Sequence, residues 1–206
     1  MAENKLALIV FQKNPVLGKV KTRLAATIGD HQALDVYLQL LQHTYKMINE
    51  LNGIDTYIYF SDYLENKLDE IFVDDVHFRV QNGLDLGSKM KNAFEEMFVK
   101  GYDKALIIGT DCPEISSALI NKAYIELGAA NVVFGPALDG GYYLLGMNQP
   151  TPILFDNMTW SHSKVMDDSI ERLQQKNLSF SLLDELSDID NERDWERFKN
   201  LTSQTL

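Results

Sequence analysis

The segment Leu6-Ala7-Leu8-Ile9-Val10-Phe11 is a continuous apolar run with polar residues on both sides. A run of this length without polar alternation is typical of a strand that is buried on both faces, as in a parallel sheet. Later apolar runs predict strands or extended segments at 56–60, 76–80, 105–109, 131–135, 142–146 and 178–183. Apolar residues at spacings of three and four predict helices at 31–51, 86–98, 116–128, 163–176 and 191–201.

Strands therefore alternate with helices over most of the chain, which indicates a mainly parallel sheet with helices on both faces. The alternation breaks after residue 135, where two strands follow each other without a helix between them. We therefore expect a doubly wound first half and a mixed second half. No repeat, low-complexity segment or linker divides the sequence, so residues 1–206 are predicted to form a single α/β domain.

The composition limits the class of protein. With 45% hydrophobic and 24% charged residues, the chain matches ordinary globular proteins and differs from collagens and disordered tails. The net charge of −11 disfavours nucleic acid as a partner, and no apolar run approaches the roughly 20 residues that span a bilayer. The single cysteine, Cys112, excludes an internal disulfide and a cysteine-based metal site. A cytoplasmic location is the simplest expectation, because the first residues do not resemble a secretory signal.

Positive charge is concentrated near the beginning of the chain. Residues 4–29 contain no Asp or Glu and carry a charge of +5, whereas residues 30–206 carry −15 once Glu3 is counted separately as −1. The five basic residues are Lys5, Lys13, Lys19, Lys21 and Arg23. A basic island in an acidic protein indicates a local anionic ligand, although chance clustering of solvated lysines is an alternative.

In open α/β sheets, ligands bind beyond the carboxyl ends of the strands. This rule selects five segments, which are 12–23, 82–90, 109–113, 135–143 and 184–190. The first segment enters a helix whose free backbone N–H groups, with Lys and Arg side chains, suit a polyphosphate. Its spacing matches neither a Walker A loop nor the dinucleotide fingerprint, and an exposed basic helix start is the alternative. Its candidate nucleotide-binding residues are Lys13, Gly18, Lys19, Lys21 and Arg23.

Asp111 follows a buried strand directly, where an acidic residue needs a partner. It could bind Mg²⁺ or Mn²⁺ bridging phosphate oxygens, and Gly109 would let a ligand approach the backbone. The alternative is that Asp111 caps the following helix. We interpret Cys112 as a small buried side chain because no general base is adjacent in sequence.

Asp139-Gly140-Gly141 is a turn signal, and a plain hairpin is its simplest interpretation. The two glycines before Tyr142 would also admit a sugar-sized group, and Asp139 could then bind or deprotonate a hydroxyl of the acceptor. Trp160 could stack on the same ligand or cover the core.

Asp188 and Asp190 alternate in an extended segment, so both side chains point to one side and could share a cation with Asp111. The competing interpretation is that Asp190 or Asn191 caps a helix. Asp85 and Gly87 lie at another helix start, where Gly87 could permit close approach of a base or ribose. Ordinary turn and cap chemistry around Asp85 is the alternative.

Motifs from these segments occur in order across nearly the whole chain. They are Pro15-x-x-Gly18-x-Val20-Lys21-Thr22-Arg23-Leu24, Asp85-Leu86-Gly87, Gly109-Thr110-Asp111-Cys112-Pro113, Gly135-Pro136-Ala137-x-Asp139-Gly140-Gly141-Tyr142-Tyr143 and Asp188-Ile189-Asp190. Together they resemble a bacterial glycosyltransferase-like family of the nucleotide-diphospho-sugar transferase superfamily, some of whose members are named for arsenosugar biosynthesis. The sequence is more distantly similar to the phospholactate guanylyltransferases of deazaflavin-cofactor synthesis.

The resemblance implies a Rossmann-like, three-layer αβα fold of the GT-A type with a mixed, mainly parallel sheet. Lys21 and Arg23 would hold phosphates, and Asp111 would hold Mg²⁺ or Mn²⁺ with a carboxylate from residues 188–190. The first loop lacks the fuller Gly-rich nucleotidyltransferase signature. The first expectation is therefore transfer of a sugar from a nucleotide-sugar to a small-molecule acceptor. The alternatives are a nucleotidyltransferase that releases pyrophosphate and a non-catalytic nucleotide-binding protein.

Overall fold

The computed structural model describes residues 4–64, 73, 76–160 and 162–203. Within these residues, strands form one sheet in the order β3-β2-β1-β4-β6-β5-β7. The strands are β1 (Leu6–Gln12), β2 (Ile54–Phe60), β3 (Val76–Val80), β4 (Lys104–Ile108), β5 (Val132–Pro136), β6 (Tyr142–Met147) and β7 (Phe180–Leu182). The neighbouring strands are parallel, except that β6 runs antiparallel to both β4 and β5. This single antiparallel strand confirms the predicted mixed second half.

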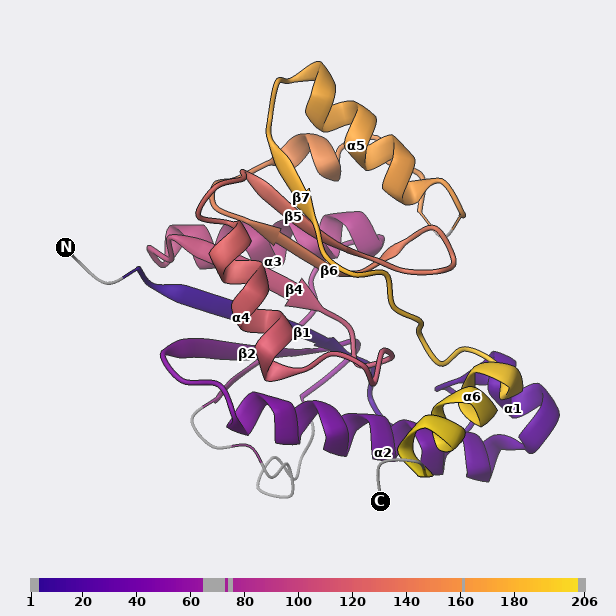
Figure 1. Cartoon of the computed structure of the whole chain (residues 1–206). Helices are drawn as coiled ribbons and strands as arrows, with labels where there is room; N and C mark the ends of the chain where they lie inside the picture. The colour runs from indigo at the N-terminus through magenta and orange to yellow at the C-terminus, as the bar shows by residue number, and fades with distance from the viewer. Residues whose placement is uncertain (1–3, 65–72, 74–75, 161, 204–206) are drawn as a thin grey trace.

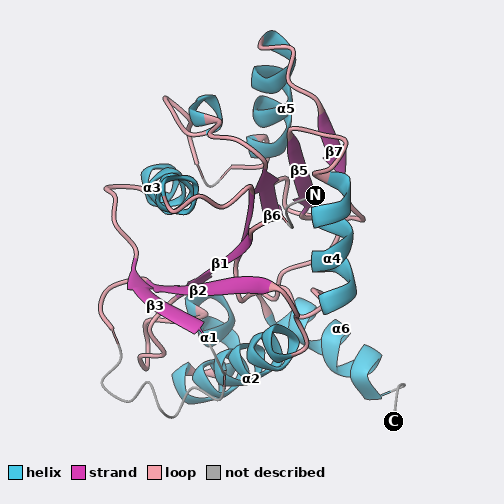
Figure 2. Ribbon diagram, turned by 90° about the vertical axis from the view of Figure 1, so that its left-hand side faces the viewer, coloured by secondary structure: helices cyan, strands magenta, loops and turns pink. Residues whose placement is uncertain are grey.

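Helices cover both faces of the sheet and complete a three-layer structure (Figures 1 and 2). They are α1 (Thr22–Ile28), α2 (Asp30–Asn49), α3 (Leu86–Val99), α4 (Ser117–Glu126), η2 (Pro152–Leu154), α5 (Val165–Gln175) and α6 (Glu192–Ser203). Helices α2 and α4 pack on one face, and α3 and α5 pack on the other. None of the helices in the described part of the chain has the length and hydropathy needed to cross a membrane.

Strand β1 lies inside the sheet and is buried on both faces, as its unbroken apolar run predicts. Leu8 and Val10 belong to the hydrophobic cluster beneath α2 and α4, whereas Ala7 and Ile9 belong to the cluster beneath α3. All four side chains are fully buried. Because successive side chains of a strand point to opposite faces, one short segment contributes to both cores.

The C-terminal part of the chain returns to its beginning. Figure 1 shows α6 beside α1, at the end of a long connection from β7. A third cluster joins these elements, since Leu24 of α1 and Ile189 of the connection are buried together, with Trp195 of α6 packed against them. The packing therefore brings residues 188–190 next to the loop that follows β1, although more than 160 residues separate them in sequence.

Candidate active site

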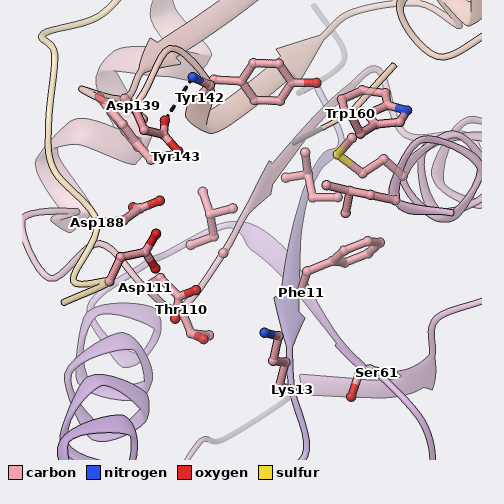
Figure 3. A pocket seen from close by; sticks show the side chains of 18 of the residues that line it. Phe11, Lys13, Ser61, Thr110, Asp111, Asp139, Tyr142, Tyr143, Trp160 and Asp188 are labelled. Atoms are coloured by element: carbon pink, nitrogen blue, oxygen red, sulfur yellow. Dashed lines mark hydrogen bonds between the residues drawn. The ribbon is translucent and has the colours of Figure 1, made fainter. Parts of the chain in front are cut away.

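A cavity of about 920 Å³ opens at the edge of the sheet where β1 and β4 end and β6 begins. Each of the five segments selected from the sequence contributes to its lining, among them Lys21 and Arg23 from the first and Asp188 and Asp190 from the last. In Figure 3, the carboxylates of Asp111, Asp139 and Asp188 lie on one side of this cavity and Phe11 and Trp160 on the other. The prediction that these segments meet in one place is confirmed.

Lys21 and Asp111 form a short, partly buried ion pair in the lining of the cavity. Lys21 Nζ lies 2.6 Å from Asp111 Oδ1, and it also donates a 2.7 Å hydrogen bond to the carbonyl oxygen of Ile189. The Lys21 side chain is 4% exposed, whereas that of Asp111 is 39% exposed. Asp111 therefore has one oxygen bound to a buried ammonium while the carboxylate remains accessible from the cavity.

Arg23 and Asp190 form a second pair on the same side. Arg23 Nη1 lies 3.1 Å from Asp190 Oδ2, and the Arg23 side chain is 78% exposed. Asp190 does not cap α6, because Asn191 Oδ1 accepts hydrogen bonds from the backbone N–H groups of Arg193 and Asp194. Asn191 is therefore the cap that the alternative interpretation expects, and the side chain of Asp190 pairs with Arg23.

Asp111 likewise does not cap the helix that follows it. The side chain of Ser116 caps α4 by accepting a 3.2 Å hydrogen bond from the backbone of Leu119. The carboxylate of Asp111 instead faces the cavity. Cys112 beside it is buried, and burial raises the pKa of its thiol to about 12. A thiol with such a pKa is protonated at neutral pH, so the prediction of a small structural side chain at Cys112 is supported.

The pKa of the Asp188 carboxyl group is raised by its surroundings. Burial, together with the nearby carboxylate of Asp111, raises its pKa to about 7, although the Lys21 ammonium acts in the opposite direction. The carboxylates of Asp190 and Asp139 also raise it. Negative charge is therefore crowded here beyond what Lys21 offsets, as in a site that receives a further cation.

The residues present fit a divalent metal that is only partly held by protein. Asp111 and Asp188 offer the oxygen ligands that Mg²⁺ and Mn²⁺ prefer. Among the described residues, no three His, Cys, Asp or Glu side chains are grouped so that they could hold a metal. Mg²⁺ is commonly bound by one or two carboxylates together with substrate phosphates. The two carboxylates therefore suit an ion whose coordination is completed by a nucleotide.

Asp139 lies in the turn between β5 and β6, which is the hairpin that the sequence predicts. Its Oδ1 accepts a 2.9 Å hydrogen bond from the backbone of Gly141, and both residues line the cavity together with Tyr142. Gly140 does not belong to this lining. Its φ is +87°, and a Cβ there would lie 2.1 Å from the carbonyl oxygen of Ser163, so this glycine serves the turn and its packing.

Trp160 covers Gly87 at the beginning of α3. A Cβ on Gly87 would lie 2.3 Å from the indole Nε1, and the ring also stacks on Phe155 with centroids 6.4 Å apart. The space over Gly87 is therefore filled by Trp160 and is not open to a base or ribose. Trp160 lines the cavity and also covers the core, so both of its expected roles have a structural basis.

Asp85 is the N-cap of α3. Its Oδ1 accepts a 2.7 Å hydrogen bond from the Ser88 backbone, and this contact lowers the pKa of the carboxyl group. Ser88 Oγ in turn accepts from the Asp85 backbone, which completes a capping box. The cap alternative is therefore correct for Asp85, which also lines the cavity.

The candidate phosphate-binding residues of the first loop separate into two groups. Lys13, Lys21 and Arg23 line the cavity, as does Gly109 at the end of β4, whereas Gly18 and Lys19 do not belong to the lining. Both of these residues are exposed. Gly18 has a φ of +72°, which points to a role in turning the loop.

Sequence reasoning missed a polar group beneath the cavity. Tyr37 of α2 is buried, and its hydroxyl bonds both the N–H and the carbonyl of Lys13 at 2.9 Å and lies 3.4 Å from Thr110 Oγ1. Burial raises the pKa of Tyr37, so its hydroxyl stays protonated. Gln12 also lines the cavity, and its Oε1 accepts a 2.6 Å hydrogen bond from Tyr45. In the sequence both tyrosines look only like members of an apolar helix face.

The chain is similar to a protein family and to solved structures. Residues 44–162 match the family described as "Uncharacterized protein conserved in bacteria (DUF2064)", whereas no curated protein matches the sequence significantly. A solved structure from Desulfovibrio desulfuricans G20, whose name provisionally places it among the nucleotide-diphospho-sugar transferases, is 31% identical with a TM-score of 0.83. The match covers 92% of this chain and 84% of that one.

More distant structures share the fold. CMP:2-keto-3-deoxy-manno-octonic acid synthetase complexed with CTP is 12% identical with a TM-score of 0.56, over 98% of this chain and 100% of that one. Rv0371c from Mycobacterium tuberculosis H37Rv in complex with manganese is 9% identical with a TM-score of 0.57, over 94% and 97% of the two chains. The predicted three-layer fold is therefore confirmed.

Proposed function

Because the chain belongs to the bacterial DUF2064 family and to the nucleotide-diphospho-sugar transferase superfamily, we propose that it is a metal-dependent transferase acting on a nucleotide-activated substrate. The first choice of reaction is transfer of a sugar from a nucleotide-sugar to a small-molecule acceptor. The arsenosugar branch and the similarity to phospholactate guanylyltransferases stay predictions.

One observation carries the proposal: exposed cations and crowded carboxylates line the same cavity. Arg23 and Lys13 offer positive charge to phosphates, and Asp111 and Asp188 offer oxygen ligands to a metal. A bound Mg²⁺ or Mn²⁺ would offset the charge that builds on the departing phosphate. In the distant neighbours, one structure is a complex with CTP and another a complex with manganese, which supports this choice of ligands.

The protein's own residues would divide the remaining work. Arg23 would orient the phosphates, since its guanidinium reaches into solvent at the edge of the cavity. Asp139 would accept the proton of an acceptor hydroxyl or orient it, because its carboxylate faces the cavity from the β5–β6 turn. Trp160 and Tyr142 would provide an apolar wall for the acceptor. Loss of Asp139 should then lower turnover more than nucleotide affinity.

Nucleotidyl transfer is the second candidate, because the synthetase complexed with CTP is matched over nearly the full length of both chains. The two reactions differ in their products. A glycosyltransferase releases a nucleoside diphosphate from a nucleotide-sugar, whereas a nucleotidyltransferase releases pyrophosphate from a nucleoside triphosphate.

A ligand panel followed by product analysis tests the proposal. Nucleoside triphosphates and nucleotide-sugars are first screened by thermal shift with and without Mg²⁺, since ligand at about 100 Kd adds roughly 2.7 kcal/mol of stability. Hits are then incubated with candidate acceptors, and nucleoside diphosphate and pyrophosphate are measured. Asp111→Asn should abolish turnover, and Asp184→Asn, at an exposed carboxylate outside the cavity lining, is the matched control. Binding without turnover that tolerates Asp111→Asn would instead establish a non-catalytic nucleotide-binding protein.

A further inference from the structure

Lys21 has an unusual position for a lysine at the edge of a ligand cavity. Its side chain is 4% exposed, and its backbone adopts the left-handed conformation, with φ 48° and ψ 42°. This conformation is unfavourable for a residue with a Cβ. In this conformation the Lys21 ammonium lies close to two oxygen atoms, 2.6 Å from Asp111 Oδ1 and 2.7 Å from the carbonyl oxygen of Ile189.

The two oxygen atoms belong to the segments that carry the metal-binding candidates. Asp111 follows β4, and Ile189 lies between Asp188 and Asp190. The backbone N–H of Ile189 also donates a 2.9 Å hydrogen bond to the carbonyl oxygen of Asp111. Lys21 therefore connects the first loop, the end of β4 and the C-terminal connection at one point.

We propose that Lys21 is a positioning residue that serves as the internal cation of the site. It holds Asp111 and residues 188–190 together, so that free divalent metal binds weakly and binds well only with a nucleotide. The nucleotide part of this statement rests on the function proposed above, whereas the effect of Lys21 on free metal does not.

The charges explain the expected weakness of metal binding. The Lys21 ammonium lies 2.6 Å from one oxygen of Asp111, so it offsets negative charge that a second cation would otherwise meet there. A metal ion would also be repelled by the ammonium that already occupies one oxygen of Asp111. Phosphates would supply the missing negative charge and ligands. The Lys21 ammonium already directs two of its three N–H donors at Asp111 and Ile189, which leaves at most one donor for a phosphate.

A metal titration without nucleotide tests this inference. Mn²⁺ binding is measured by electron paramagnetic resonance and by calorimetry in the wild type and in Lys21→Met, which keeps the length of the side chain but removes its charge. The affinity for Mn²⁺ should increase about tenfold or more in Lys21→Met, because the Asp111 carboxylate then has no ammonium bound to it and no cation beside it repels the metal. Adding Asp111→Asn to Lys21→Met should remove this gain.

Two variants control for charge and for general effects. Lys21→Arg keeps the positive charge and should retain weak Mn²⁺ binding. Lys19→Met removes an exposed lysine of the same loop that does not line the cavity, and it should leave Mn²⁺ affinity unchanged. If Lys21→Met is poorly folded, the titration is repeated in trimethylamine N-oxide, which favours compact states.

An unchanged Mn²⁺ affinity in folded Lys21→Met would overturn the inference. A second result would also overturn it. If Lys21→Met loses as much nucleotide affinity in metal-free buffer as Arg23→Gln does, and gains no affinity for Mn²⁺, Lys21 is a direct phosphate ligand. A protein that fails to bind any nucleotide would disprove the proposed function and leave the Mn²⁺ comparison intact.

Discussion

Two ion pairs join residues 21–23 to later parts of the chain, and they differ in length and in burial. Lys21 and Asp111 are 2.6 Å apart, and the lysine is almost completely buried. Arg23 and Asp190 are 3.1 Å apart, and the arginine is 78% exposed. The two basic residues are separated by one position in the sequence, yet one belongs to the interior and the other to the solvent.

The difference in burial suits the two basic residues to different tasks. A buried ammonium cannot leave its acceptors without leaving unpaired polar groups, so Lys21 determines where Asp111 and Ile189 lie. An exposed guanidinium loses little when it changes partner, because exposed ion pairs are worth about 0–1 kcal/mol. Arg23 is therefore free to exchange Asp190 for a phosphate. Substitutions of Lys21 and of Arg23 should therefore separate an effect on the free energy of unfolding from an effect on ligand affinity.

The largest effect is expected for Lys21→Met on stability. The substitution leaves the Ile189 carbonyl without its donor and Asp111 without its cation, so the free energy of unfolding should fall by about 3 kcal/mol. Urea denaturation followed by circular dichroism measures this change. The double variant Lys21→Met, Asp111→Asn should recover part of the loss. A decrease of less than about 1 kcal/mol would mean that the two pairs are energetically alike.

A smaller effect of opposite sign is expected for Asp188→Asn in metal-free buffer. The pKa of Asp188 is raised from 3.8 to about 7, so the folded protein keeps a proton that the unfolded chain releases between about pH 4 and pH 7. Stability therefore falls as pH rises through this range, and the cost is complete above pH 7. Asn cannot ionise, so the variant should be more stable than the wild type by about 2 kcal/mol at pH 8.

The pH dependence provides the control for this prediction. The stability difference between Asp188→Asn and the wild type should be smaller at pH 5 than at pH 8, when both proteins are unfolded with urea in the presence of a chelator. A difference that does not change with pH would show that Asp188 is not the titrating group. The same variant should lose turnover, since a stabilising substitution in a functional site commonly costs activity.

The fold and the meeting of the five segments at one cavity could be predicted, because both follow from simple periodic patterns. The buried run of β1 and the alternation with helices indicate a parallel sheet, and strand ends in such a sheet meet at one edge. For that reason the sequence assigns Asp111, Asp139 and Asp188 to one edge of the sheet, and all three line the cavity. The break after residue 135 likewise indicates a mixed second half, and in the structure β6 is the antiparallel strand there.

The partners of individual residues could not be predicted, because they depend on backbone conformation and long-range packing. The sequence shows glycine at positions 87 and 140, but it does not show whether a ligand or the protein itself fills the space beside them. In the structure Trp160 fills the space at Gly87 and the Ser163 backbone fills it at Gly140. Similarly, nothing in the order of Lys21 and Arg23 indicates that the first adopts a left-handed conformation and turns inward.

The smallest effect on stability, with a clear effect on binding, is expected for Arg23→Gln. Because Arg23 is mostly exposed, its loss should change the free energy of unfolding by less than about 1 kcal/mol. If the guanidinium contacts phosphates, nucleotide affinity should nevertheless fall about tenfold, and its dependence on salt should become weaker. Calorimetry at two salt concentrations measures both effects, with Arg193→Gln in exposed α6 as the matched control. An affinity equal to that of the wild type would show that Arg23 serves Asp190 alone, and the two ion pairs would then differ in burial but not in task.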